Sequence, residues 1–139
     1  MKIDVVCMGK LREKFFREAV EEYLTRLRRF VQVSVTEVDN PNKIERLLEG
    51  KDFIIILDEK GEEMDSFQFA ELIRDLSLSK KNICFVVGGW EGLDDRIKRK
   101  ANLVWSLSKL TFPYQMARLL LLEQTYRAFT IIKGIDYHK

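Results

Sequence analysis

Two hydrophobic patterns alternate along this 139-residue chain and predict an α/β protein. Short apolar runs, typical of strands, are separated by longer segments whose hydrophobic residues recur at helical spacing. The predicted strands are residues 3–8, 30–38, 53–57, 83–87 and 103–107. The predicted helices are residues 12–27, 41–48, 66–78, 94–100 and 114–133, with Asp65 or Ser66 capping the third. No linker or repeat interrupts this order, so we expect residues 1–139 to form a single domain.

The arrangement of the strands follows from how completely apolar they are. Residues 53–57 and 83–87 are continuous apolar runs, which is typical of strands buried on both faces of a parallel sheet. Five strands, each followed by a helix or helical turn, predict a mostly parallel five-stranded sheet covered on both sides. Ligands of such sheets bind beyond the carboxyl ends of the strands. The loops after Leu57, Val87 and Leu107 are therefore the candidate binding loops.

Two of these loops have an unusual composition. The loop after Val87 contains Gly88, Gly89 and Gly92, and glycines permit a close approach of the backbone to a ligand. It fits neither a Walker loop nor a dinucleotide fingerprint, and a tight strand-to-helix turn explains it equally well. The loop 106–113 mixes Leu and Phe with Ser and Thr, which suits a pocket for a flat, partly apolar ligand. A buried turn packed on the core is the alternative interpretation.

The last predicted helix, residues 114–133, is apolar on more than one side. A helix that covers one face of a sheet needs a single apolar stripe, so the second side favours a helix–helix homodimer interface. Arg118 lies among leucines in this helix, and arginine is seldom buried without a partner or ligand. Glu123 and Arg127 are four residues apart, a spacing that allows a simple surface pair.

The composition does not by itself identify a binding partner. The chain has 24 Lys and Arg against 22 Asp and Glu, so its net charge of +2 does not by itself indicate a nucleic-acid partner. Basic clusters at residues 10–14, 26–29 and 96–100 could contact a phosphate backbone, although solvated helix faces explain each of them. Residues 137–139 combine an aromatic ring with cationic groups, which suits base stacking; a disordered chain end is the alternative.

The rare residue types exclude several kinds of site. His138 is the single histidine, and Cys7 and Cys84 each lie in an apolar run far apart in the sequence. We therefore expect no metal site and no catalytic cysteine or serine that depends on a histidine base. Asp4 falls where a signal peptide would be apolar, and no apolar run approaches the roughly 20 residues of a membrane span. The expected location is the cytoplasm, without membrane association.

Several short segments together resemble one family, the ribosomal RNA large subunit methyltransferase H family of the SPOUT (α/β-knot) superfamily. The resemblance covers the whole chain. It rests on residues 1–3, 9–14, 22–23, 88–93, 110–113, 118–121, 123–124, 126–129, 134 and 137–139.

The resemblance implies a fold and an activity that the residue patterns alone do not. The fold would be an α/β knot, with a C-terminal trefoil knot, and the protein would be a homodimer. The cofactor would be S-adenosylmethionine, and the reaction would methylate N3 of a pseudouridine in 23S ribosomal RNA, on free RNA or on the ribosome. Base placement and charge stabilisation would fall to Arg118, Tyr137 and His138. The implied cofactor-binding residues are Leu57, Gly88, Leu107, Ser108, Lys109, Leu110, Thr111 and Phe112.

Some alternatives stay open at this point. The family commonly has Pro-His where this chain has Pro113-Tyr114, so a chemical role of that histidine would pass to Tyr114 or be positional only. The sequence does not indicate which residue, if any, acts as the general base. A SPOUT methyltransferase for another RNA, such as transfer RNA, and a non-catalytic RNA- or nucleotide-binding module are the competing functions.

Overall fold

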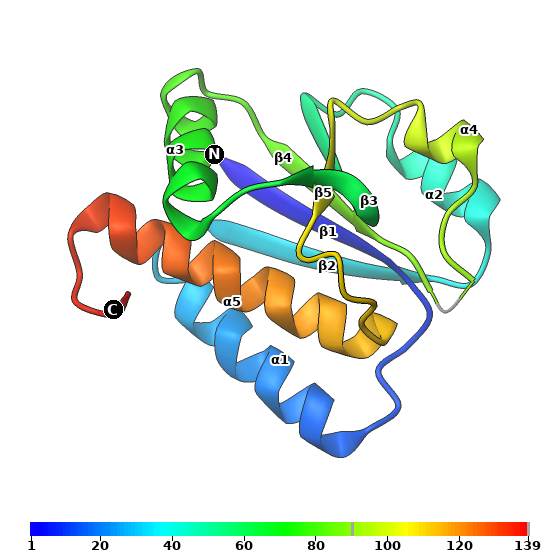
Figure 1. The fold of residues 1–139 in the computed structure, drawn as a ribbon, viewed down its shortest axis with the longest axis horizontal. Helices are drawn as coiled ribbons and strands as arrows, with labels where there is room; N and C mark the ends of the chain where they lie inside the picture. Colours follow the sequence, from blue (N-terminus) through cyan, green and yellow to red (C-terminus); the bar gives the residue numbers. More distant parts are fainter. Residues whose placement is uncertain (90, 139) are drawn as a thin grey trace.

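Five parallel strands form the centre of the fold, and helices cover both of their faces (Figure 1). The structure is a computed structural model that describes residues 1–89 and 91–138. Within these residues the elements, in chain order, are β1 (Lys2–Met8), α1 (Lys14–Leu27), β2 (Gln32–Val38), α2 (Pro41–Leu47), β3 (Phe53–Glu63), α3 (Ser66–Leu78), β4 (Ile83–Val87), α4 (Asp95–Lys98), β5 (Leu103–Ser106) and α5 (Tyr114–Lys133).

The strand order is β2-β1-β4-β3-β5, and every pair is parallel. Ile83 of β4 pairs with Ile3 of β1 on one side and with Phe53 of β3 on the other. Every residue of β4 is buried, as its continuous apolar sequence predicts. The predicted parallel α/β sheet is confirmed, and the carboxyl ends of its strands lie at the same edge.

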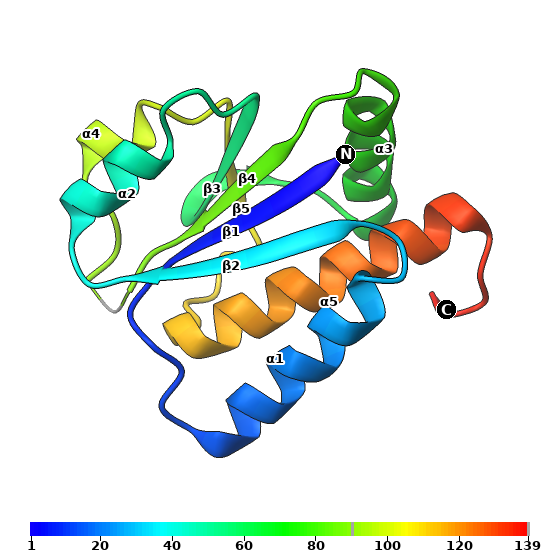
Figure 2. The same cartoon turned by 180° about the vertical axis from the view of Figure 1, so that it is seen from behind.

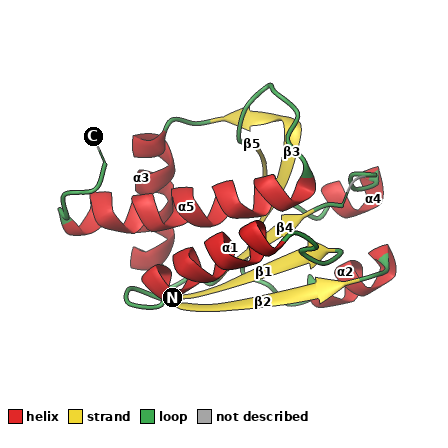
Figure 3. Ribbon diagram, turned by 90° about the horizontal axis from the view of Figure 1, so that it is seen from below, coloured by secondary structure: helices red, strands yellow, loops and turns green. Residues whose placement is uncertain are grey.

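Side chains of the central strands alternate between two hydrophobic cores. One core lies under α1, α3 and α5 and includes Val5, Ile55 and Phe85. The other lies under the short helices α2 and α4 and includes Ile56 and Val86. Figures 2 and 3 show the same division, with the three long helices grouped together and α2 and α4 apart from them. The helices therefore leave the edge with the carboxyl ends of the strands to loops.

Local signals in the sequence explain where several helices begin and end. Asp65, rather than Ser66, caps α3: its carboxylate accepts from the backbone N–H of Gln68, and the Gln68 side chain accepts from the N–H of Asp65. Asn40 caps α2 in front of Pro41. Gly134 ends α5 with a φ of 68°, a left-handed conformation that glycine adopts without strain.

Two strand boundaries differ from the sequence prediction. The second strand begins at Gln32 rather than at Phe30, because the N–H groups of Phe30 and Val31 donate to the carbonyl of Leu27 and continue the end of α1. The third strand continues past Leu57 to Glu63 and pairs with β5 again beyond an irregularity. A Cβ atom at Gly61 would lie 2.4 Å from the carbonyl oxygen of Val104, so this second pairing requires glycine.

The second apolar side of α5 has partners within the chain. The helix packs against both α1 and α3 as well as the sheet (Figures 1 and 2). Leu121, Leu122 and Phe129 are buried in this way, and the rings of Phe30 and Phe129 stack with centroids 5.9 Å apart. Intramolecular packing thus accounts for part of the pattern that favoured a dimer. The homodimer and the trefoil knot remain predictions.

Candidate active site

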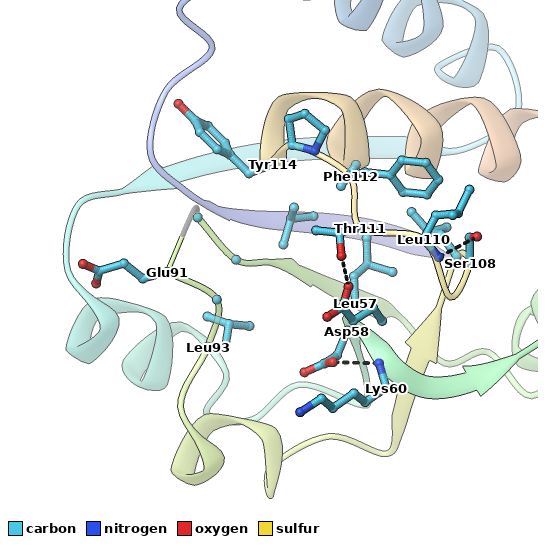
Figure 4. A pocket seen from close by; sticks show the side chains of 18 of the residues that line it. Leu57, Asp58, Lys60, Glu91, Leu93, Ser108, Leu110, Thr111, Phe112 and Tyr114 are labelled. Carbon is cyan, nitrogen blue, oxygen red and sulfur yellow. Dashed lines mark hydrogen bonds between the residues drawn. The ribbon is translucent and has the colours of Figure 1, made fainter.

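A pocket of about 830 Å³ lies where the carboxyl ends of β3, β4 and β5 meet the start of α5 (Figure 4). All three candidate segments contribute to it: the part of β3 that follows Leu57, which was expected to be a loop, and the loops after Val87 and Leu107. Their predicted convergence is confirmed. The lining residues are Leu57, Asp58, Glu59, Lys60, Val87, Gly88, Gly89, Glu91, Gly92, Leu93, Lys98, Leu107, Ser108, Leu110, Thr111, Phe112, Pro113, Tyr114 and Ala117.

The loop between β5 and α5 is fixed by its own hydroxyl groups. Ser106 donates to the carbonyl of Ser108 at 2.8 Å, and the Ser108 hydroxyl accepts from the N–H of Leu110 at 3.0 Å. Thr111 donates to a carboxylate oxygen of Glu59 at 2.5 Å, which ties this loop to β3. The loop is therefore ordered without being a buried turn, and its apolar side chains are free to line the pocket.

The glycine-rich loop is closed on itself beside the pocket. Gly89 and Gly92 form an isolated antiparallel bridge, and Gly92 has a φ of 77°. A Cβ atom at Gly88 would lie 3.1 Å from Cγ of Leu93 and 3.3 Å from the carbonyl carbon of Gly92. A side chain at Gly88 would therefore require Leu93 or the backbone of Gly92 to shift by a few tenths of an ångström. Trp90, which belongs to the resembling segment 88–93, lies outside the described residues.

The two ends of the pocket differ in polarity. Toward α5 the lining is apolar, with Phe112 and Pro113, whereas Asp58 and Lys60 lie toward α4 (Figure 4). The Asp58 carboxylate pairs with the ammonium of Lys98 at 2.5 Å and accepts from the N–H of Lys60 at 2.9 Å. Partial burial raises the pKa of Asp58, but these hydrogen bonds outweigh burial and hold the pKa below its ordinary value. Asp58 therefore stays ionised at neutral pH.

The predicted cofactor-binding residues all line this pocket except Lys109. The Lys109 side chain is 88% exposed, and its ammonium lies 3.8 Å from Glu63, outside the pocket. Tyr114, which replaces the family's histidine, lines the pocket and donates to the carbonyl of Lys10 at 3.2 Å. This contact joins the start of α5 to the loop after β1. Position 114 thus has a positional role in this chain.

Arg118, predicted to serve base placement and charge stabilisation, is not among the residues that line the pocket. The residue is 2% exposed, and its guanidinium donates to Glu37 at 2.7 Å and to the carbonyl of Gly9 at 3.2 Å. The Nε atom has no hydrogen-bond partner among the described residues. The side chain fixes the ends of β1 and β2 against α5.

Burial also raises the pKa of Cys7, on the same side of the sheet, to about 12, so this thiol stays protonated.

This pair joins a buried guanidinium to a carboxylate that is 37% exposed, and it leads to a stability prediction. Glu37→Ala leaves the buried Arg118 guanidinium without its countercharge, and because solvent screens Glu37 in part, we expect the free energy of unfolding to fall by about 2 kcal/mol. Glu22→Ala removes the carboxylate of an exposed pair with Arg26, which solvent screens, so its effect should be much smaller. Urea unfolding of both variants measures the difference. An equal loss of unfolding free energy in the two variants would show that the Glu37–Arg118 pair stabilises the fold no more than the exposed pair does.

Tyr137 and His138 are held by side chains of α1, α3 and α5. Tyr137 donates to Glu123 at 2.9 Å and lies 3.2 Å from the hydroxyl of Tyr23. His138 Nδ1 lies 2.9 Å from the guanidinium of Arg127, and its ring packs edge-on against Phe67. The tail is therefore ordered through residue 138, and Glu123 and Arg127 do more than pair on the surface. Lys139 lies outside the described residues.

The tail cluster and the pocket are separate within one chain. Arg127 is ten positions beyond Ala117, the last α5 residue that lines the pocket, or about 15 Å along the helix axis. Figure 1 shows the chain end beside the C-terminal half of α5, whereas the pocket is at the start of that helix. Within one chain, the structure does not bring Tyr137 and His138 together with the predicted cofactor-binding residues. Arg118 directly follows Ala117 of the lining, but its side chain contacts Glu37 and Gly9.

Most of the basic clusters are neutralised locally. Lys14 and Arg26 pair with glutamates of α1, and Arg96 and Lys100 pair with Glu45. These contacts fit solvated helix faces. In the described ranges, no helix has the length and apolar character of a membrane span, and no cluster of His, Cys, Asp and Glu could hold a metal ion.

Comparison with known proteins agrees with the fold. Residues 1–138 match the family described as "Predicted SPOUT methyltransferase". Ribosomal RNA large subunit methyltransferase H of Caldicellulosiruptor saccharolyticus is 44% identical over 155 aligned positions, covering 99% of both chains. A probable methylase family protein from Haemophilus influenzae Rd KW20 aligns with a TM-score of 0.67 at 13% identity, over 99% of this chain and 70% of the other. The SpoU methyltransferase AviRb of Streptomyces viridochromogenes, solved with the cofactor AdoMet, aligns with a TM-score of 0.57 at 13% identity, over 91% and 57%.

The parallel sheet and its helical layers are those of the SPOUT methyltransferase class. Within this class, the chain belongs to the ribosomal RNA large subunit methyltransferase H family.

The sequence reasoning missed several residues of the site. Asp58 and Glu59 directly follow a buried strand, a position that itself indicates a binding loop. The sequence indicated only that Lys98 belongs to a basic cluster, and nothing in it links Lys98 to Asp58. Glu37, the partner of Arg118, carried no such signal, and Tyr23, the partner of Tyr137, was noted only as part of the resembling segment 22–23.

Proposed function

We propose that this chain is a single-domain, cytoplasmic, S-adenosylmethionine-dependent methyltransferase that methylates N3 of a pseudouridine in 23S ribosomal RNA. The observation that carries the proposal is the pocket built by the loops after Leu57, Val87 and Leu107 in a chain of this family. The knot that the family resemblance implies belongs to the proposal, because it would hold these loops together.

The pocket has the size and chemistry for the cofactor. Its volume of about 830 Å³ lies in the usual range for small-molecule sites, roughly 300–1,000 Å³. Leu57, Leu107 and Phe112 offer apolar surface to the faces of an adenine ring, and the ordered loop 106–113 offers backbone groups to its edge. Gly88 keeps the opposite wall free of a side chain.

When bound, the cofactor supplies a methyl group that its sulfonium already activates. The protein then has to align this group with the acceptor nitrogen and help that nitrogen lose its proton. We assign contact with the RNA base to Tyr137 and His138, which offer an aromatic ring and a titratable imidazole. Arg118 acts as a positioning residue, because it fastens α5, whose first turn lines the pocket, to Glu37 of β2 and to Gly9 after β1.

The position of the tail supports a homodimer. Tyr137 and His138 are fixed about 15 Å along α5 from the pocket of their own chain. A site that uses both the pocket and the tail is completed if a second copy contributes its tail. The partly exposed apolar residues of α5, such as Leu119 and Leu120, would pack in this contact.

Sedimentation tests this assembly. We expect a mass near twice 16.4 kDa at micromolar concentration. A folded monomer at that concentration would contradict the proposed composite site.

Methyl transfer from labelled S-adenosylmethionine tests the function and separates the alternatives. Assembled ribosomes, free 23S RNA and transfer RNA should be compared as acceptors under the same conditions. We expect label in ribosomes or 23S RNA and none in transfer RNA. Label only in transfer RNA would support the other RNA substrate, and cofactor binding without any transfer would support a non-catalytic module.

A further inference from the structure

The charged end of the pocket contains one ion pair that is set into its wall. The side chains of Asp58 and Lys98 are 14% and 30% exposed, and they join β3, directly after Leu57, to the short helix α4. The other charged lining residues, Glu59, Lys60 and Glu91, are exposed. A charged ligand group in this end of the pocket would therefore meet Asp58 and Lys98 where solvent screens them least.

Both members of the pair have hydrogen-bonding capacity left. An ammonium group has three donors, and the only ion-pair partner of Lys98 in the described part of the chain is Asp58. A carboxylate accepts up to about four hydrogen bonds, and Asp58 accepts from Lys98 and from the N–H of Lys60. The wall thus offers spare donors on a cation next to spare acceptor positions on an anion.

We infer that the Asp58–Lys98 pair is the subsite that recognises the amino-acid end of the cofactor. This inference rests on the proposed function. The amino-acid end carries a carboxylate and an ammonium on adjacent carbons, so it matches a neighbouring cation and anion: Lys98 donates to the carboxylate, and Asp58 accepts from the ammonium. The opposite polarity of the two pocket ends gives the orientation, with the nucleoside toward Phe112 and the amino acid toward α4 (Figure 4).

A purely structural role predicts something different. If the pair only fastened α4 to β3, its removal would disturb the pocket as a whole, and every ligand of the pocket would bind more weakly. If the pair recognises the amino acid, only ligands that possess this group would lose affinity.

Two small molecules separate these roles. S-adenosylhomocysteine has the nucleoside and the amino-acid end, whereas 5′-methylthioadenosine has the nucleoside and sulfur without the amino acid. Calorimetry should measure the affinity of both for the wild type, Asp58→Asn and Lys98→Met. Lys100→Met is the matched control, because it removes a charge next to α4 and the pairing of Lys100 with Glu45, which does not line the pocket.

The wild type is expected to bind S-adenosylhomocysteine more tightly than 5′-methylthioadenosine. Each pocket variant should lose about tenfold or more in affinity for S-adenosylhomocysteine, with 5′-methylthioadenosine unchanged, since a hydrogen bond to a charged group has this weight. Lys100→Met should resemble the wild type. An equal loss for both molecules in the pocket variants, no loss for either, or no preference in the wild type would overturn the subsite and leave the proposed function intact. A wild type that binds neither S-adenosylmethionine nor these molecules would overturn the proposed function itself.

Discussion

Deleting residues 137–139 should reduce methyl transfer to ribosomes by about 10²-fold or more, with affinity for S-adenosylmethionine nearly unchanged. The reason is that Tyr137 and His138 are anchored to α1, α3 and α5 and share no residue with the pocket. The deletion removes groups that place the RNA base but leaves the cofactor-binding loops untouched. Single-turnover kinetics and calorimetry on the same preparation measure the two quantities.

A single substitution refines this result. His138→Ala should lose less activity than the deletion, and its loss should be larger if the imidazole removes the N3 proton. Full activity in the three-residue deletion would show that the tail has no catalytic part. Loss of cofactor binding would instead make the tail a structural part of the pocket.

Gly88→Val should abolish measurable binding of S-adenosylmethionine while the chain stays folded. The new Cβ atom would lie 3.1 Å from Leu93 and 3.3 Å from Gly92, so the loop must open or the side chain must enter the pocket. Calorimetry measures binding, and urea unfolding confirms that the fold persists. Unchanged affinity would remove Gly88 from the site.

These two variants together test whether the tail acts on the partner's pocket. The tail deletion keeps a working pocket, and Gly88→Val keeps a working tail. Refolding a mixture of the two chains should restore part of the methyl transfer, because a heterodimer can combine one intact pocket with one intact tail. A mixture that stays inactive would indicate that tail and pocket act within the same chain.

The elements of the fold could be predicted because their signals are local. Apolar runs and caps such as Asp65 located the strands and helices to within a few residues. The continuation of β3 to Glu63 could not be predicted, because its residues after Leu57 are mostly charged. Their second pairing with β5, at Glu62 and Glu63, depends on the close backbone approach at Gly61. The apolar second side of α5 was ambiguous for a similar reason, since the sequence does not distinguish α1 and α3 from a second copy.

The site could be predicted as far as its loops. Parallel strands place their carboxyl ends at one edge, so Leu57, Gly88 and Leu107 converge by topology. The ion pair between Asp58 and Lys98 could not be foreseen, because it depends on how α4 lies against the sheet. Arg118 was recognised as unusual, but only the structure identifies Glu37 as its partner.

The identity of the methylated nucleoside tests the central claim most directly. Ribosomes should be incubated with the protein and S-adenosylmethionine, and the 23S RNA then digested and analysed by mass spectrometry. The account predicts a new pseudouridine that carries its methyl group on N3, absent when Gly88→Val replaces the wild type. A methyl group on another nucleoside, or no methylation of 23S RNA by a protein that binds the cofactor, would contradict it.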